Sequence, residues 1–114
     1  MARIRITAGE VSQTATLNSS LTAGKLMGIL PVTAKANVWG QEIYFNVPLH
    51  MGPEEPAARV PSGTIAYWPE GPSMCIFFGQ VPYSPVNVVG RLDGNADDFA
   101  KVRAGQDVRV EAVA

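Results

Sequence analysis

The segment Tyr67–Pro85, with the sequence YWPEGPSMCIFFGQVPYSP, decides how the chain is expected to fold. It combines five aromatic residues with several prolines and carries hardly any charge. Two aromatic pairs, Tyr67–Trp68 and Phe77–Phe78, fall within stretches that are typical of strands. Neighbouring residues of a strand point to opposite faces of a sheet, so one member of each pair must lie outside the core. Tyr67 and Trp68 are therefore candidates for an outer aromatic surface.

The prolines and aromatic residues are concentrated in the middle of the chain. All nine prolines lie between Pro31 and Pro85, and eight of the nine aromatic residues lie between Trp39 and Tyr83. The two ends are aliphatic and are expected to form a scaffold. A chain of 114 residues fits one compact domain, residues 1–114, and can bury a core without a disulfide or a metal ion.

Alternation of polar and apolar residues predicts about eight short strands. They are expected at residues 3–7, 10–17, 32–38, 41–47, 64–68, 74–78, 86–92 and 107–113. In the fourth of these strands, Ile43, Phe45 and Val47 would share one face, with Glu42 and Tyr44 on the other. Residues 48–62 contain four prolines and are expected to form a long loop.

Two short helices complete the predicted elements. The first begins after a serine N-cap and ends before Pro31, which cannot extend it. The second is capped by Asn95 and contains Phe99 and Val102. Many short strands with few long connections predict a mainly β protein, a closed antiparallel barrel whose ends are covered by the two helices.

Charge and composition exclude several classes of function. The net charge of −1 offers no basic surplus for binding nucleic acid. No apolar run approaches the roughly 20 residues that cross a bilayer, and the N-terminal residues MARIRITAGE lack the apolar region of a signal peptide. We therefore expect a cytoplasmic protein with no nucleic-acid or membrane partner. The single cysteine, Cys75, is expected to be a buried apolar residue rather than a nucleophile.

His50 is the only histidine, and two carboxylates, Glu54 and Glu55, lie close to it in the sequence. One imidazole and two carboxylates on a proline-rich loop do not have the spacing of a recognised metal site. We interpret His50 as a solvated loop residue and expect neither a metal ion nor another cofactor. No arrangement of serine, histidine and aspartate for nucleophilic catalysis is evident.

Glu42 lies on a predicted strand beside Trp39 and Tyr44 and has two interpretations. A carboxyl group among aromatic rings could have a raised pKa and act as a general acid or base. Such a residue more often faces solvent or pairs with a lysine or arginine. The sequence favours the second interpretation without excluding the first.

Four stretches resemble the small prokaryotic cyclophilin-like family, whose function is uncharacterised. They are NVWGQEIYF at 37–45, YWPEG at 67–71, CIFFG at 75–79 and VNVVGR at 86–91. The resemblance implies a closed eight-stranded barrel with a helix at each end. It also implies a groove on the outer face of the barrel, where cyclophilins hold the proline of a peptide.

Cyclophilins lower the barrier to rotation about a prolyl bond, about 18–20 kcal/mol, with an apolar seat for the proline ring and an arginine beside the amide. The resemblance places that arginine at Gln41, which carries no charge. It places a substrate-binding glutamine at Pro48, which has no side-chain hydrogen-bonding group, and a histidine at Val86. The polar half of the isomerase site is therefore expected to be lost.

The apolar half of the site is expected to remain. The resemblance matches one phenylalanine of the cyclophilin pocket to Phe45 and a second to Phe77 or Phe78, with Tyr83 near the position of a tryptophan. Together with Gln41, these residues are the candidates for a ligand-binding groove. Such a groove would hold a peptide or a small molecule.

Three functions remain open from the sequence. The favoured one is a non-catalytic binding module that uses the remnant groove. The first alternative is a peptidyl-prolyl isomerase with a rebuilt cationic group. The second is a structural protein that forms homodimers through its outer aromatic residues, since exposed aromatic pairs are common at protein interfaces.

Overall fold

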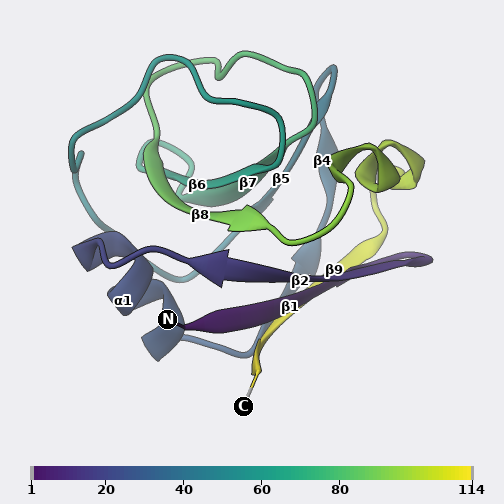
Figure 1. The fold of residues 1–114 in the computed structure, drawn as a ribbon, viewed down its shortest axis with the longest axis horizontal. Coiled ribbons are helices and arrows are strands. Elements are labelled where there is room, and N and C mark those ends of the chain that lie inside the picture. The colour runs from purple at the N-terminus through teal and green to yellow at the C-terminus, as the bar shows by residue number, and fades with distance from the viewer. Residues whose placement is uncertain (1, 114) are drawn as a thin grey trace.

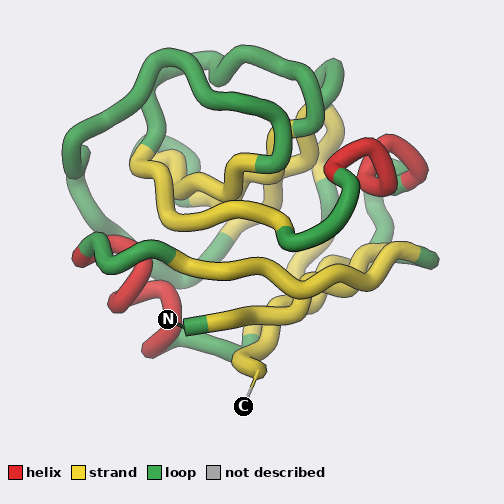
Figure 2. The backbone as a smooth tube through the Cα atoms, in the orientation of Figure 1, coloured by secondary structure: helices red, strands yellow, loops and turns green. Residues whose placement is uncertain are grey.

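The computed structural model describes residues 2–113, which form one antiparallel sheet of nine strands that curves into a barrel (Figures 1 and 2). The strands are β1 (Arg3–Ala8), β2 (Val11–Leu17), β3 (Val32–Lys35), β4 (Asn37–Val38), β5 (Glu42–Asn46), β6 (Thr64–Trp68), β7 (Ser73–Phe77), β8 (Asn87–Leu92) and β9 (Asp107–Val113). Their order in the sheet is β3-β9-β1-β2-β8-β6-β7-β5-β4. The prediction of a mainly β antiparallel barrel is confirmed.

The barrel nearly closes through a bend at Ala36. Strands β3 and β4 stand at opposite ends of the sheet order, yet only Ala36 separates them in the chain. The backbone N–H of Ala36 donates to the carbonyl oxygen of Gln106, and the N–H of Gly105 donates to the carbonyl oxygen of Ala36. The predicted single strand at 32–38 is therefore divided, because its first half pairs with β9 and its second half with β5. This division accounts for nine strands where about eight were expected.

Alternation along the central strands separates two apolar clusters. Ile43 of β5, Ile76 of β7 and Ile65 of β6 lie side by side across the sheet and are fully buried in the barrel interior. The strand residues that alternate with them point outward and form a second cluster with two loop valines. Its buried members are Ala66, Cys75, Phe77 and Val86, and Tyr44, Val60 and Trp68 pack against them. The predicted opposite faces of β5 are thus confirmed, with Glu42 and Tyr44 on the outer side of the sheet.

Two short helices lie on opposite sides of the barrel (Figure 2). Helix α1 spans Leu21–Gly28, and the hydroxyl of its N-cap Ser20 accepts a hydrogen bond from the N–H of Ala23. The second helix, η1, is a 3-10 helix at Ala96–Lys101 that buries Phe99 completely. Within residues 2–113, neither helix is long and apolar enough to cross a membrane.

The long loop at residues 48–62 is attached to α1 and β8 by a partly buried polar network. The carboxylate of Glu54 accepts hydrogen bonds from the N–H groups of Leu21 and Thr22 and from the Thr22 hydroxyl. The side chain of Asn87, which is fully buried, accepts from the N–H of Glu54 and donates to the Thr22 hydroxyl and to the carbonyl oxygen of Gly52. The network holds the loop against the start of β8.

Candidate ligand pocket

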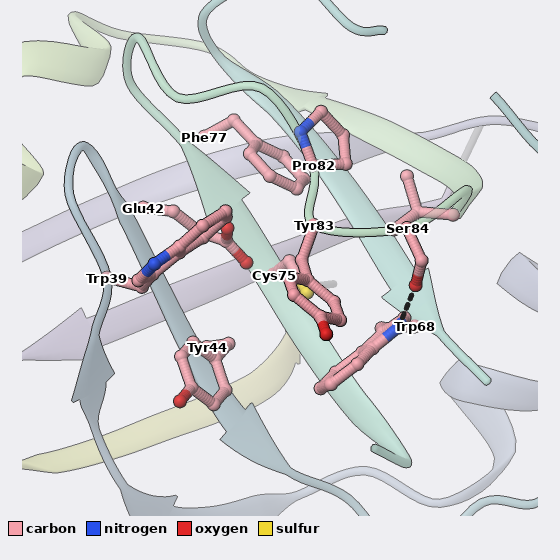
Figure 3. Close-up of a pocket in the computed structure, with 10 residues that line it drawn as sticks. Trp39, Glu42, Tyr44, Trp68, Cys75, Phe77, Pro82, Tyr83 and Ser84 are labelled. Atoms are coloured by element: carbon pink, nitrogen blue, oxygen red, sulfur yellow. Dashed lines mark hydrogen bonds between the residues drawn. The ribbon is translucent and has the colours of Figure 1, made fainter. Parts of the chain in front are cut away.

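A pocket of about 380 Å³ lies on the outer face of the barrel, over β5, β7 and β6 and beneath the loop that joins β7 to β8 (Figure 3). Most of its lining is apolar. The residues that line it are Trp39, Glu42, Tyr44, Trp68, Cys75, Phe77, Pro82, Tyr83, Ser84 and Val86. We call this space the outer pocket.

Four aromatic rings form the walls of the outer pocket and are named here the aromatic cage: Trp39, Tyr44, Trp68 and Tyr83. The ring centroids of Trp39 and Tyr83 are 5.9 Å apart at an interplanar angle of 81°, and those of Tyr83 and Trp68 are 6.2 Å apart at 76°. Trp68 and Tyr44 follow at 6.3 Å and 84°. Because each ring stands nearly perpendicular to the next, the four rings enclose a space instead of forming a stack.

The cage is assembled from two strands, a turn and a loop. Tyr44 projects from β5 and Trp68 from the end of β6, while Trp39 lies in the turn between β4 and β5. Tyr83 comes from the loop before β8, and Figure 3 shows it between Trp39 and Trp68. Its side chain is 76% exposed, so it stands at the mouth of the pocket.

A chain of hydrogen bonds joins the loop before β8 to β6. The indole N–H of Trp68 donates to the hydroxyl of Ser84 at 2.7 Å, drawn as the dashed line in Figure 3. The Ser84 hydroxyl in turn donates to the carboxylate of Glu70 at 3.2 Å. These contacts fix the orientation of the Trp68 ring and place Tyr83 beside it.

Glu42 contributes the pocket's only carboxyl group, from the outer face of β5. The residue is 5% exposed, and its Oε1 atom has no hydrogen-bond partner among residues 2–113. Burial raises its pKa from the ordinary value of 4.5 to about 7, and the thiol of Cys75 beside the carboxyl lowers it in part. Glu42 is therefore divided between its neutral and ionised forms near neutral pH.

The sequence left two interpretations of Glu42, and the structure supports the raised pKa. The residue does not face solvent, and it forms no ion pair with any residue from 2 to 113. The ion pairs found within residues 2–113 lie elsewhere, between Arg3 and Asp93, Lys35 and Asp107, and Arg109 and Glu111.

Cys75 lies at the base of the outer pocket, on β7 opposite Tyr44. It is 1% exposed, as expected for a cysteine that serves as an apolar residue. Burial raises the pKa of its thiol well above the ordinary value, and the negative charge of Glu42 raises it further. The thiol is therefore a poor nucleophile.

Comparison with known proteins identifies the family. The model of the cyclophilin-like family matches residues 2–111. The chain belongs to the cyclophilin-like family. Among solved structures, this cyclophilin-like protein resembles the hypothetical protein AF2241 from Archaeoglobus fulgidus, with 29% identity over 98% of this chain and 95% of the other and a TM-score of 0.83.

A second solved structure shares the fold. McbB, determined in complex with tryptophan, has 19% identity and a TM-score of 0.71 over 95% of this chain. The match covers 44% of McbB, and at this level of identity it shows the fold alone. No curated protein matches the cyclophilin-like chain.

The structure places two of the predicted groove residues, Phe77 and Tyr83, in the lining of the outer pocket. It differs from the prediction at Phe45 and Phe78, which belong to the interior cluster. Phe45 is inward because it alternates with Glu42 and Tyr44 on β5, and Phe78 is inward because it follows the outward Phe77. Neither ring can reach a ligand on the outer face.

Gln41 lies outside the lining of the outer pocket. It is exposed in the turn before β5, where its carbonyl oxygen accepts hydrogen bonds from the N–H groups of Phe78 and Gln80. Its side chain packs against Gly79, so closely that a Cβ atom on this glycine would lie 2.3 Å from the Gln41 Oε1 atom. Gln41 therefore holds the start of the loop before β8.

The predicted outer aromatic surface divides between the two faces of β6. Trp68 lines the outer pocket, whereas Tyr67 is fully buried in the interior. The hydroxyl of Tyr67 donates to the carbonyl oxygen of Leu49 and accepts from the N–H of Met51. Tyr67 thus supports the long loop from inside and presents no outer surface.

Sequence reasoning did not include Trp39, Tyr44 and Cys75 in the groove. Tyr44 carried a usable signal, because it shares a strand face with Glu42. Cys75 lies opposite Tyr44 only through the pairing of β5 with β7, a register that connects residues about 30 positions apart in the sequence.

The remaining candidates from the sequence lie away from this site. His50 is exposed on the long loop, while Glu54 accepts hydrogen bonds at the start of α1, which lower the pKa of its carboxyl group. Residues 2–113 contain no group of three or more histidine, cysteine or acidic side chains arranged to hold a metal ion.

Proposed function

We propose that this cyclophilin-like protein is a non-catalytic binding module and that the outer pocket holds a small organic molecule. The observation that carries the proposal is an open apolar pocket of about 380 Å³ with four aromatic walls and a buried carboxyl group. Its volume lies within the range of about 300–1,000 Å³ that is usual for small-molecule sites. Such sites combine apolar walls with a few polar groups that orient the ligand, as the aromatic cage and Glu42 do here.

A small molecule fits the outer pocket better than an extended peptide. Peptide recognition by extended chains uses a row of hydrogen-bonding groups along a groove. The lining supplies few polar groups, and one of them, the Ser84 hydroxyl, already bonds to Trp68 and Glu70. The space between Trp39 and Trp68 suits one compact ligand.

Prolyl isomerase activity finds no support in the lining of the outer pocket. The reaction requires a cationic donor beside the amide nitrogen of the substrate. None of the residues that line the pocket is basic, and Gln41 and Val86 occupy positions where the family resemblance places an arginine and a histidine. We expect a protease-coupled prolyl peptide assay to give the rate of the buffer blank.

A homodimer that buried the mouth of the pocket is the competing structural role. Trp39 and Tyr83 are exposed by 41% and 76%, and Val38 and Val81 beside them in the sequence by 42% and 47%. If this rim serves ligand entry, light scattering at high concentration should give the monomer mass of 12.1 kDa. A dimer of twice that mass that dissociates when Tyr83 is replaced would contradict the binding proposal.

Tryptophan fluorescence provides the test of binding. Trp39 and Trp68 are the only two tryptophans and both line the outer pocket, so all indole emission reports on it. The protein should be screened against small amines, alcohols, carboxylates, nucleosides and prolyl peptides. Calorimetry should be used for tryptophan itself, which is included because the McbB structure contains it.

A matched pair of variants localises any binding that is found. Tyr83→Ala removes an exposed ring from the cage, and Leu21→Ala removes a comparably exposed side chain, 72% against 76%, from α1. We expect Tyr83→Ala to weaken the best ligand about tenfold, the order of one aromatic contact, and Leu21→Ala to leave it unchanged. Equal effects of the two variants, or no response to any class of compound, would reject the proposed function.

A further inference from the structure

One oxygen of the Glu42 carboxyl group lacks a hydrogen-bond partner within the outer pocket, while the thiol of Cys75 lies beside the carboxyl group. The residue is buried, and its Oε1 atom accepts no hydrogen bond from residues 2–113. The other titratable groups of the lining are Tyr44 on the same strand, Cys75 on β7 and Tyr83 in the loop before β8. None of these can carry a positive charge, so the lining contains no group that neutralises an ionised Glu42.

A buried carboxyl group with one unbonded oxygen and no neutralising charge is costly to the protein that carries it. Burying an acceptor without a hydrogen bond disfavours the folded state, and burying an unpaired charge does so more strongly. Because the Glu42 side chain reaches the lining of the outer pocket, a ligand can supply the missing donor. A donor that also carried a positive charge would remove both costs.

The aromatic cage favours the same kind of ligand. The faces of aromatic rings carry negative partial charge and attract cations, with tryptophan the strongest of them. Two of the four rings of the cage belong to tryptophans, Trp39 and Trp68. The nearly perpendicular orientation of successive rings allows a compact cation to contact more than one of them.

The geometry points to the primary ammonium ion of a small organic amine as the occupant of the outer pocket. In this arrangement an ammonium N–H group donates to the Glu42 carboxylate, and the apolar body of the amine packs among Tyr44, Trp68 and Phe77. This inference rests on the proposed function, since it names the chemical class of ligand for the same pocket.

Other ligand classes satisfy only part of the site. An organic carboxylate would place a second negative group beside Glu42. A neutral alcohol can donate one hydrogen bond but supplies no charge. A quaternary ammonium ion supplies the charge for the rings but has no N–H group for the unpaired oxygen. The preference among these classes is therefore a measurable signature of the inference.

The test compares three amines with the alcohols of the same shape. The three pairs are butylamine with butanol, 2-phenylethylamine with 2-phenylethanol, and 2-naphthylethylamine with 2-naphthylethanol. The trimethylammonium form of each amine is also tested. Binding is measured by calorimetry at pH 6 and pH 8. Alkylamines remain protonated over this range, as the lysine side chain does with its pKa near 10.4, so a change in affinity reports on the protein.

At pH 8 we expect at least one primary amine to bind about tenfold more tightly than its alcohol, with the trimethylammonium form in between. The affinity of that amine should fall at pH 6, because Glu42 is then largely neutral, while the affinity of the alcohol should stay constant. Glu42→Gln should remove both the preference and the pH dependence. Glu111→Gln, which changes the net charge equally at an exposed site on β9, should remove neither.

The outcomes separate the inference from the function on which it rests. If alcohols bind as tightly as their amines in every pair, the outer pocket binds ligands but the ammonium inference is overturned. If none of the compounds binds and the wider fluorescence screen is also silent, the proposed function fails with it. Thermal unfolding of Glu42→Gln shows whether the variant is folded, and the pH dependence of the wild-type protein tests the inference without any substitution.

Discussion

The indole N–H of Trp68, at the end of β6, donates a 2.7 Å hydrogen bond to the hydroxyl of Ser84 in the loop before β8. The two residues are 16 positions apart in the chain, and their contact spans one side of the outer pocket. It sets the plane of one wall of the aromatic cage. The hydrogen bond from Trp68 of β6 therefore positions the loop that carries Tyr83.

Replacing Ser84 with alanine should release Trp68 from this orientation. The variant leaves the indole N–H and one oxygen of Glu70 without their partner, so we expect a loss of about 1 kcal/mol in the free energy of unfolding. Urea unfolding measures this loss, and the position of the tryptophan emission should shift toward that of exposed indole. Unchanged stability and emission would mean that the hydrogen bond does not fix the wall. Ser12→Ala, at an exposed serine on β2, is the control.

Glu42 should make the stability of the protein depend on pH in an unusual direction. Its pKa is raised from 4.5 to about 7, so the folded state holds a proton that the unfolded state has released between these values. The contribution of this group is complete below pH 4.5 and is lost as pH rises through 7. We expect Glu42→Gln to gain about 2 kcal/mol relative to the wild type between pH 5 and pH 8.

Chemical denaturation at several pH values tests this expectation. The difference in unfolding free energy between the wild type and Glu42→Gln should grow from pH 5 to about pH 7 and level off above it. A difference that stays constant would show that the carboxyl group has an ordinary pKa. The carboxyl group of Asp93 provides a contrast, since hydrogen bonds from Thr14, Arg3 and Thr16 lower its pKa to about 2, and Asp93→Asn should lose stability above that pH.

Asn87 should be among the most sensitive positions of the fold outside the apolar core. Its amide makes three hydrogen bonds, with the Glu54 N–H, the Thr22 hydroxyl and the Gly52 carbonyl oxygen, and it is fully buried. Asn87→Ala leaves these groups unsatisfied, which should cost about 3 kcal/mol. Asn37→Ala, an exposed asparagine with a single 3.3 Å hydrogen bond, should cost less than about 1 kcal/mol.

Hydrogen exchange follows the same substitution at the long loop. The amide of Met51 bonds to the Tyr67 hydroxyl and that of Ala57 to the carbonyl oxygen of Val86, so both should exchange slowly in the wild type. In Asn87→Ala they should exchange faster than the amides of β1. Uniform exchange across loop and sheet in the variant would mean that the network does not hold the loop separately.

Cys75 should remain unreactive in the native protein. Its thiol is 1% exposed and its pKa is raised well above the ordinary value, so little thiolate is present at neutral pH. Reaction with a disulfide reagent at pH 8 should be slow and should accelerate to the rate of a free thiol in urea. A fast stoichiometric reaction under native conditions would show that the pocket base opens to solvent.

The strand pattern could be predicted from the sequence because alternation reports directly on the two faces of a sheet. Ile43 and Phe45 were expected together on one face of β5 with Glu42 and Tyr44 opposite, as found. The division at Ala36 could not be predicted, because it arises where the chain changes its pairing partner from β9 to β5. Such a change of partner depends on the curvature of the whole sheet into a barrel and leaves no local signal in the sequence.

The site was predicted less completely than the fold, and the reason lies in two conflicting signals. The family resemblance matched Phe45 to a pocket residue, whereas alternation placed the Glu42 face of β5 on the opposite side from Phe45. Alternation was the better guide, since the outer pocket lies on the Glu42 face. The contact between the rings of Tyr44 and Trp68 depends on how β5 pairs with β7 and how β7 pairs with β6. The sequence does not specify these two registers.

The most direct test of the central claim follows the two indole N–H signals of Trp39 and Trp68 by NMR during titration with the small-molecule panel. Both side chains line the outer pocket, and the spectrum contains no other tryptophan. The account predicts that a binding compound shifts both signals together, with the same dissociation constant, and leaves the amides of β1 and β9 unchanged. A panel that moves neither signal, or a ligand whose shifts gather on β1 and β9, would contradict it.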